Sequence, residues 1–302
     1  MAGYIAEFFG FRSEDHSDAS LSHAAKRQCP FLGDTCTKVL SRDAEIAGVC
    51  AIRQMTEGSP PVICCPNRMY ADQYKLLYKV ASKAFNEKLN LYAGRNAVLK
   101  AKSENGAVAV FGHGWGGELR LPQRRGTGSY FVDWVLAKLD GNGDLIEFTA
   151  IEVQTIDTTG NYREARKKLL LDRSLSVDTV GLNWENVSKR IIPQIIYKGQ
   201  VLQREELCKT GLFFVSPKPV FDRVLTRLGG KAKLPIFPKQ PASINFIAYD
   251  YSDEEFMDGE IRNLEIVEEH CTTVYKIQEA FSSLDLPEGN VYRDAIKRSL
   301  YG

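Results

Sequence analysis

The sequence predicts an α/β fold preceded by a small cysteine-rich subdomain. Helical and strand patterns follow one another from residue 71 onwards, which is typical of a sheet covered by helices. Residues 1–70 differ, because they show little sustained periodicity and hold five of the seven cysteines. We therefore expect a metal-binding subdomain over residues 1–70, held by something other than a hydrophobic core, and a second domain over residues 71–302.

The composition is that of an ordinary globular protein. The 302 residues are 44% hydrophobic and 25% charged, with 39 Lys and Arg against 38 Asp and Glu. No apolar run approaches the roughly 18 residues that a membrane-spanning helix needs, and the N-terminus lacks the features of a signal peptide. We therefore expect no membrane segment. The odd number of cysteines, together with the missing signal peptide, predicts a cytoplasmic protein without a disulfide framework.

Apolar periodicity predicts the elements of the second domain in order. A helix is expected over residues 71–90, and two strands over residues 129–139 and 145–156. Residues 140–144 between these strands read Asp-Gly-Asn-Gly-Asp, a turn sequence, so the two strands form a β-hairpin. Further helices are expected over residues 162–171, 183–207 (kinked by Pro193) and 267–281, and buried strands over residues 212–215 and 243–249.

Four cysteines of the first domain suit a metal site. Four thiolates can surround zinc or iron tetrahedrally, and binding would supply folding energy that a segment without a core lacks. Proline and glycine flank several of these cysteines, as expected where the backbone turns around a metal. The alternative is a set of scattered buried thiols. The candidate ligands of structural Fe or Zn²⁺ are Cys29, Cys36, Cys50 and Cys65, with Cys64 as an extra thiol.

The predicted hairpin carries two acids inside apolar stretches. Asp133 and Glu152 would be costly there unless they are paired or bind a metal, and adjacent strands can bring them to one divalent cation. An Asp followed by Glu-x-Gln on the next strand is the layout of a PD-(D/E)xK nuclease site, with Gln154 in the usual place of lysine. Glu118 could add a third carboxylate. The alternatives are a salt-bridged edge strand for the pair and a surface acid for Glu118.

With these motifs combined, the chain resembles the NotI family of restriction endonucleases. A four-cysteine cluster followed by the D…ExQ pattern is specific as a combination, although each part alone is not. The matching segments keep the order of the family from the first residues to about residue 198. They are residues 5–10, 29–32, 48–50, 65–68, 116–119, 133–134, 152–155 and 186–190.

The resemblance implies a bacterial type II restriction endonuclease that acts as a homodimer on double-stranded DNA. Its fold would be a PD-(D/E)xK core, a central mixed sheet flanked by helices, behind the four-cysteine subdomain. Its DNA site would be a GC-rich palindrome containing CGGCCG, cut to leave 5′-phosphate ends. The cysteines would hold structural iron, with zinc as the alternative. Catalytic Mg²⁺ would be held by Asp133, Glu152 and the Val153 carbonyl, with Gln154 in the lysine position and Glu118 as support.

Basic side chains near these motifs are the candidate DNA contacts. Arginine and lysine can bridge O6 and N7 of guanine in the major groove, but most protein–DNA hydrogen bonds go to phosphates, so a phosphate contact is the alternative for each. The candidates are Arg120, Arg124 and Arg125 before the hairpin, and Lys189 and Arg190 in the matching helical segment.

Net charge does not exclude DNA as a partner, because the charge is segregated. Residues 250–269 contain nine acids and one base, which leaves 38 bases against 29 acids in the rest of the chain. This surplus can bind a phosphate backbone, and the acidic stretch would lie outside the DNA-binding patch. Two other functions remain open: a nuclease of the repair type, and a non-catalytic, metal-stabilised DNA-binding protein in which Gln154 marks a lost active site.

Overall fold

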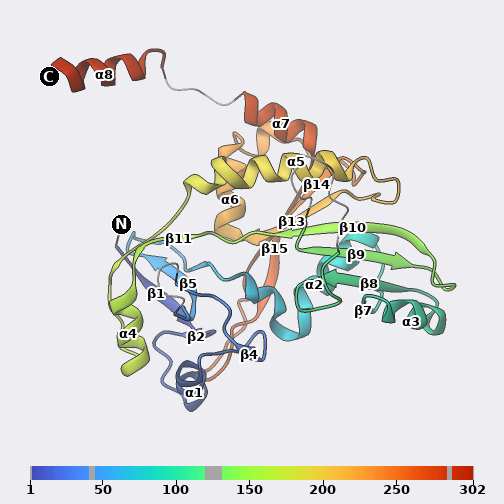
Figure 1. Ribbon diagram of the computed structural model, residues 1–302, viewed down its shortest axis with the longest axis horizontal. Coiled ribbons are helices and arrows are strands. Elements are labelled where there is room, and N and C mark those ends of the chain that lie inside the picture. Colours follow the sequence, from blue (N-terminus) through green and yellow to red (C-terminus); the bar gives the residue numbers. More distant parts are fainter. Residues whose placement is uncertain (1, 41–44, 120–130, 284–287, 302) are drawn as a thin grey trace.

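The computed structural model describes residues 2–40, 45–119, 131–283 and 288–301. A seven-stranded mixed sheet with the order β15-β14-β13-β10-β9-β8-β7 forms its centre, and helices cover both faces (Figure 1). The predicted α/β class with a central mixed sheet is therefore confirmed. The strands are β7 (Leu91–Ala93), β8 (Ala107–Gly112), β9 (Trp134–Leu139), β10 (Leu145–Val153), β13 (Leu212–Pro217), β14 (Ser243–Tyr251) and β15 (Leu264–Thr273).

Smaller sheets and the helices complete the fold. A four-stranded sheet contains β2 (Phe11–Arg12), β1 (Gly3–Phe8), β5 (Val49–Gln54) and β6 (Val62–Ile63); β3 (Gln28–Cys29) pairs with β4 (Asp34–Thr35), and β11 (Thr158–Asn161) with β12 (Thr179–Leu182). The α-helices are α1 (Asp18–Lys26), α2 (Ala71–Phe85), α3 (Asn96–Glu104), α4 (Arg163–Leu171), α5 (Ile192–Leu202), α6 (Lys218–Arg227), α7 (Val274–Ser282) and α8 (Val291–Tyr301). Short turns of helix are η1 (Pro66–Tyr70), η2 (Val187–Ile191, a π-helix) and η3 (Lys231–Lys233).

The predicted hairpin is present as the antiparallel pair of β9 and β10, in which Ile151 lies opposite Trp134. Asp140 closes its turn, because the side-chain oxygen accepts the N–H groups of Asn142 at 2.9 Å and Asp144 at 3.0 Å. Such a local hydrogen bond explains why the turn could be read from the sequence. Strand β10 then pairs in parallel with β13, which joins the hairpin to the rest of the sheet.

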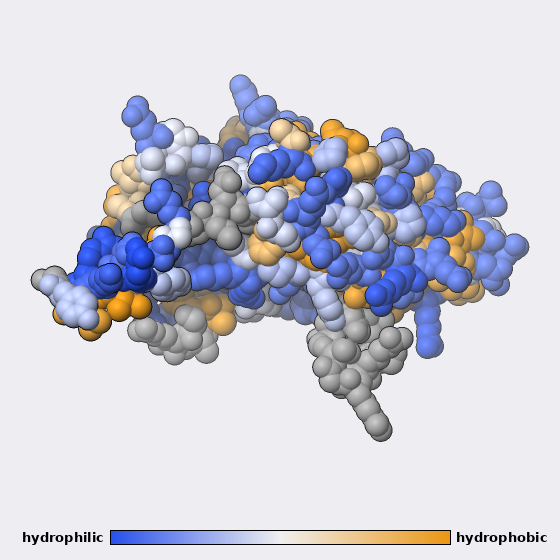
Figure 2. All heavy atoms as spheres, turned by 90° about the horizontal axis from the view of Figure 1, so that it is seen from above, coloured by the Kyte–Doolittle hydropathy of each residue, from blue (hydrophilic) through white to orange (hydrophobic). Residues whose placement is uncertain are grey.

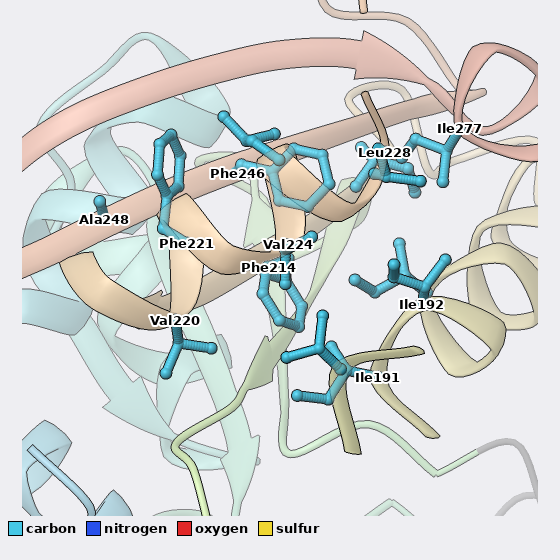
Figure 3. Packing of buried hydrophobic residues seen from close by; sticks show 14 of the residues in the cluster. Ile191, Ile192, Phe214, Val220, Phe221, Val224, Leu228, Phe246, Ala248 and Ile277 are labelled. Carbon is cyan, nitrogen blue, oxygen red and sulfur yellow. The ribbon is translucent and has the colours of Figure 1, made fainter. Parts of the chain in front are cut away.

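The central sheet is buried on both faces, so its strands read as continuous apolar runs. In β13, Phe214 faces α5, α6 and α7, whereas Phe213 faces α2. Figure 3 shows the first of these cores, in which Phe246 lies against Phe214 and Phe221 with ring centroids 5.7 and 6.3 Å apart. Helix α5 contributes Ile192 to this core.

The N-terminal region has a hydrophobic core, so the expectation that something else holds it together is wrong. Ile5, Phe8, Phe9 and Ile52 are each at most 1% exposed and pack with the buried cysteines. Helix α4 and strand β12, which follow the hairpin in sequence, also pack against this sheet. Register shifts within β1 break the alternation of its side chains, which hid these strands from a periodicity analysis.

The predicted helix over residues 267–281 is wrong in its first half. Strand β15 continues to Thr273, paired with β14 along its whole length, and α7 begins only at Val274. The Thr273 hydroxyl accepts the N–H of Lys276 at 3.3 Å and caps the helix. A register shift in this strand pair disturbs the period of two, so the segment resembles a helix in sequence.

The outer surface is mainly polar, with scattered apolar side chains in the view of Figure 2. Helix α8 stands apart from the body, and its described side chains are exposed (Figure 1). Within residues 2–40, 45–119, 131–283 and 288–301, no helix is long and apolar enough to cross a membrane.

Candidate active site

Two acidic residues meet where the hairpin strands end. Asp133 comes directly before β9, and Glu152 is the penultimate residue of β10. Continuing the register in which Ile151 opposes Trp134 places Asp133 opposite Glu152, so that both side chains project on the same face. The Val153 N–H donates to Asp133 Oδ2 at 2.7 Å and fixes the orientation of that carboxylate.

The Glu152 carboxylate is buried, and only one of its two oxygens has a hydrogen-bonding partner among the described residues. The residue is 8% exposed, and its Oε1 lies 2.5 Å from Nζ of Lys198 on α5. Among the described residues, Oε2 is buried without a hydrogen-bond partner. Burial, followed by the negative charge of Asp133, raises the pKa of Glu152 to about 7, while Lys198 acts in the opposite direction. A divalent cation would satisfy the free oxygen and reduce the repulsion between the two acids, so these residues fit Mg²⁺.

Asp133 lines a pocket of about 380 Å³, together with Glu118, His113 and Tyr70. Its side chain reaches solvent, although protein atoms surround it. This crowding raises the pKa of Asp133, and the charge of Glu118 adds to the rise, against the Val153 hydrogen bond and Lys198. The pocket therefore reaches the acidic pair at Asp133.

Glu118 is close enough to influence Asp133 electrostatically, but it is exposed and its Oε1 lies 4.0 Å from His113 Nδ1. In the described parts of the chain, no group of three or more His, Cys, Asp or Glu side chains is arranged to hold a metal ion. Two carboxylates are enough for Mg²⁺, because this ion keeps several waters and takes further oxygens from a phosphate substrate.

Gln154 lies one residue beyond the end of β10. Its N–H donates to the Val215 carbonyl at 2.9 Å and continues the parallel ladder, while its side-chain Nε2 donates to the Thr155 carbonyl at 2.7 Å. In this conformation the amide is held by neighbouring backbone. An amide in this place can orient a water or a phosphate but brings no positive charge.

Sequence reasoning missed Lys198, which is the positive charge at this site. Its side chain is 15% exposed and makes the ion pair with Glu152. A signal was present, because Lys198 is the single charged residue of α5. A lysine is seldom buried unless it is paired, so a lone lysine on an apolar helix indicates a buried anionic partner.

The five cysteines of the N-terminal region are all buried. The thiols of Cys29, Cys36 and Cys50 each interact electrostatically with Cys65, but within the described residues they are not arranged as a metal-binding group. Burial raises the pKa of Cys29 to about 11, whereas the hydrogen bond from Cys50 lowers the pKa of Cys65. Cys64 faces Lys38 instead, with Sγ 3.5 Å from Nζ.

The candidate DNA contacts are only partly within the described residues. Lys189 pairs with Glu185 at 2.5 Å, and Arg190 with Asp157 at 3.4 Å, all on the exposed surface around η2. Because their partners are exposed, both bases can exchange these acids for phosphates at little cost. The other candidates, Arg120, Arg124 and Arg125, lie outside the described residues.

Comparison with known proteins identifies the family of the chain. The family model of the restriction endonuclease NotI matches residues 16–222, which is more than half of the chain and includes the acidic pair, Lys198 and all four candidate cysteines. No match was found among curated proteins. Family membership carries the activity with it: the chain belongs to the NotI restriction endonuclease family and is a type II site-specific deoxyribonuclease that binds and hydrolyses DNA.

Proposed function

We propose that this endonuclease cuts both strands of a GC-rich palindrome in a Mg²⁺-dependent reaction centred on Asp133 and Glu152. The observation that carries the proposal is the pair of opposed carboxylates with one buried oxygen, Glu152 Oε2, left without a partner among the described residues. The pair lies at the end of the β9–β10 hairpin in the central mixed sheet, which is consistent with the proposed PD-(D/E)xK core. Residues 71–302 would form this catalytic domain.

Each residue has a separate part in the proposed reaction. Asp133, Glu152 and the Val153 carbonyl would hold Mg²⁺, and Glu118 would support the site from the pocket wall. When bound, the ion lowers the pKa of a water and screens the phosphate charge. Gln154 would orient the attacking water in line with the leaving 3′ oxygen, so that the products carry 5′-phosphate and 3′-hydroxyl ends.

Recognition of a palindrome requires two copies of the chain. A two-fold DNA site presents the same half-site twice, and a homodimer supplies one active site to each strand. The resemblance to the NotI family supports CGGCCG as the centre of the DNA site. Arg120, Arg124, Arg125, Lys189 and Arg190 are the bases proposed to contact it. We place the enzyme in the bacterial cytoplasm, because a restriction endonuclease encounters foreign DNA there.

We also propose a structural metal in the region of residues 1–70, held by Cys29, Cys36, Cys50 and Cys65. The chemistry of four thiols favours iron or zinc, and the electrostatic interaction of Cys29, Cys36 and Cys50 with Cys65 places these thiols in one neighbourhood. The thiols do not form a closed cage within the described residues as they stand, so the ion would have to draw them together.

Digestion of phage DNA followed by sequencing of the ends tests the proposed specificity. With Mg²⁺ present, we expect every end to fall at one GC-rich palindrome and to carry a 5′-phosphate. Ends without a common sequence would indicate a nuclease of the repair type. Specific binding without cutting would contradict the assignment of the acidic pair as an intact active site.

A further inference from the structure

Lys198 is a charged residue in a position where an uncharged side chain is expected. It is the one charged residue of α5, and its side chain is only 15% exposed. Placing an ammonium group there is costly unless an anion compensates it. The compensation comes from Glu152, whose Oε1 lies 2.5 Å from Nζ. The two residues are 46 positions apart in sequence, so the contact exists only through the packing of α5 on β10.

The fold fixes the height of α5 above the sheet near this lysine. Gly199 follows it directly, and a Cβ at this position would lie 2.7 Å from Ile244 Cδ1 and 3.0 Å from Val274 Cγ2. The absence of a side chain therefore lets α5 approach β14 and α7 closely. Alternation along β10 turns Ala150 and Glu152 toward the α5 face, so the carboxylate points at the lysine.

The stem of Lys198 runs along an apolar pocket of about 380 Å³, which Val132, Val201 and Leu202 help to line. Packing of the methylene groups there leaves the ammonium group at the polar end, beside Glu152. The same ammonium group also acts on Asp133 across the site. Its charge thus acts on both acids.

We propose that Lys198 replaces the lysine of the PD-(D/E)xK motif, although it lies on α5 and not on β10. It positions Glu152 and supplies the fixed positive charge that Gln154 lacks. The proposal rests on the proposed function of the Asp133–Glu152 site. It explains how a site with glutamine in the lysine position keeps a cation beside its carboxylates. Lys198 acts through Glu152 and is therefore a positioning residue.

Removing the charge of Lys198 should affect metal binding and DNA cleavage in opposite directions, which a purely structural role would not do. In the enzyme without DNA, the ammonium group and a divalent ion are attracted by the same carboxylate, so removing the lysine favours metal binding. With DNA bound, the same removal takes away positive charge and orientation that the reaction needs. Lys198→Met, which preserves the packing of the stem, should therefore bind Mn²⁺ more tightly and cut more slowly.

The experiment uses the full chain and two readouts. Mn²⁺ binding without DNA, followed by electron paramagnetic resonance, should tighten roughly tenfold in Lys198→Met, the lower end of coupling measured for close charge pairs. Single-turnover cleavage of plasmid DNA with Mg²⁺ should slow on the order of 100-fold, as expected when one preorganised electrostatic group is lost. Lys198→Arg, which keeps the charge, should recover most of the cleavage rate. Glu152→Gln should abolish Mn²⁺ binding, which would show that the measured Mn²⁺ binds at the Asp133–Glu152 site.

Lys276→Met is the matched control, since Lys276 is also an ion-paired lysine of a helix, 2.7 Å from Glu279 on α7. It should change neither readout. If Lys198→Met unfolds, Lys198→Gln serves instead, because its amide can still donate to Glu152 without bringing charge. Unchanged Mn²⁺ affinity together with unchanged cleavage in the neutral variants would overturn the proposal. Slower cutting without tighter Mn²⁺ binding would also overturn it, and so would slow cutting that Lys198→Arg does not restore. If the wild-type enzyme itself failed to cut DNA, this would count against the proposed function instead.

Discussion

Loss of one buried ion pair should destabilise the enzyme far more than loss of an exposed pair. Arg68 and Glu7 are 0% and 2% exposed, and Arg68 Nη2 contacts both carboxylate oxygens, at 2.7 and 2.9 Å. The guanidinium group also donates to the Arg262 carbonyl at 3.1 Å and stacks over Tyr251, 5.3 Å from the ring centre. The pair therefore links β1 to the end of β14 and to the loop between β14 and β15.

Glu7→Gln leaves this arginine buried with an uncompensated charge. Breaking a buried pair from one side typically costs about 3–5 kcal/mol, and the complete burial of both partners places this pair in that range. The assay is equilibrium unfolding in urea, with m-values compared to check that both proteins unfold in the same manner. The double variant Glu7→Gln/Arg68→Met removes the charge altogether and should recover most of the loss.

An exposed pair provides the control. Glu164 and Lys167 of α4 lie 2.8 Å apart, with side chains 69% and 63% exposed, so Glu164→Gln should leave the free energy of unfolding unchanged. The reasoning is refuted if Glu7→Gln is as stable as Glu164→Gln. It is also refuted if the double variant is less stable than Glu7→Gln, because the cost would then not arise from an unpaired charge.

Three further predictions follow from other parts of the structure. Gly199→Val should lower the free energy of unfolding by about 1–3 kcal/mol through overpacking against Ile244, and should slow cleavage by lifting α5; urea unfolding and a plasmid assay measure both. Cys65→Ser should lose the iron or zinc found by elemental analysis of the purified protein, whereas Cys64→Ser should retain it; equal metal content in the two would disprove the ligand set. Burial lowers the pKa of His270, so its native form is neutral and the unfolded chain takes up the proton first as pH falls below about 6.5; between pH 7 and pH 5 the wild type should therefore lose stability relative to His270→Gln, as urea unfolding at each pH would show.

Local patterns were sufficient to predict part of the fold. The hairpin could be read from sequence because its turn is closed by Asp140 and its strands are rich in β-branched and aromatic residues. The acidic pair followed from that hairpin, since adjacent strands must bring Asp133 and Glu152 together. The helix predicted over residues 71–90 is present over Ala71–Phe85, and the buried strands predicted over residues 212–215 and 243–249 are present as β13 and β14, because their apolar patterns are clear in the sequence.

Contacts between distant segments were not predictable from the same patterns. Lys198 joins the site only because α5 packs over β10, and periodicity says nothing about which helix covers which strand. Residues 267–273 of β15 were predicted to be helical because the register shift between the pairs Ala248–Glu268 and Tyr249–Ile266 interrupts the alternation of this strand. The N-terminal core was missed because its strands are short and it is completed by α4 and β12 from beyond the hairpin.

The most direct test of Asp133 and Glu152 as the cleavage centre is single-turnover cleavage of a plasmid that carries one CGGCCG palindrome. Wild-type enzyme with Mg²⁺ should convert the plasmid to one linear product, and chelation of the metal should stop the reaction. Asp133→Ala should bind the plasmid but leave it intact, because the divalent ion loses one of its two carboxylates. Cleavage by Asp133→Ala at the wild-type rate would show that the reaction takes place elsewhere.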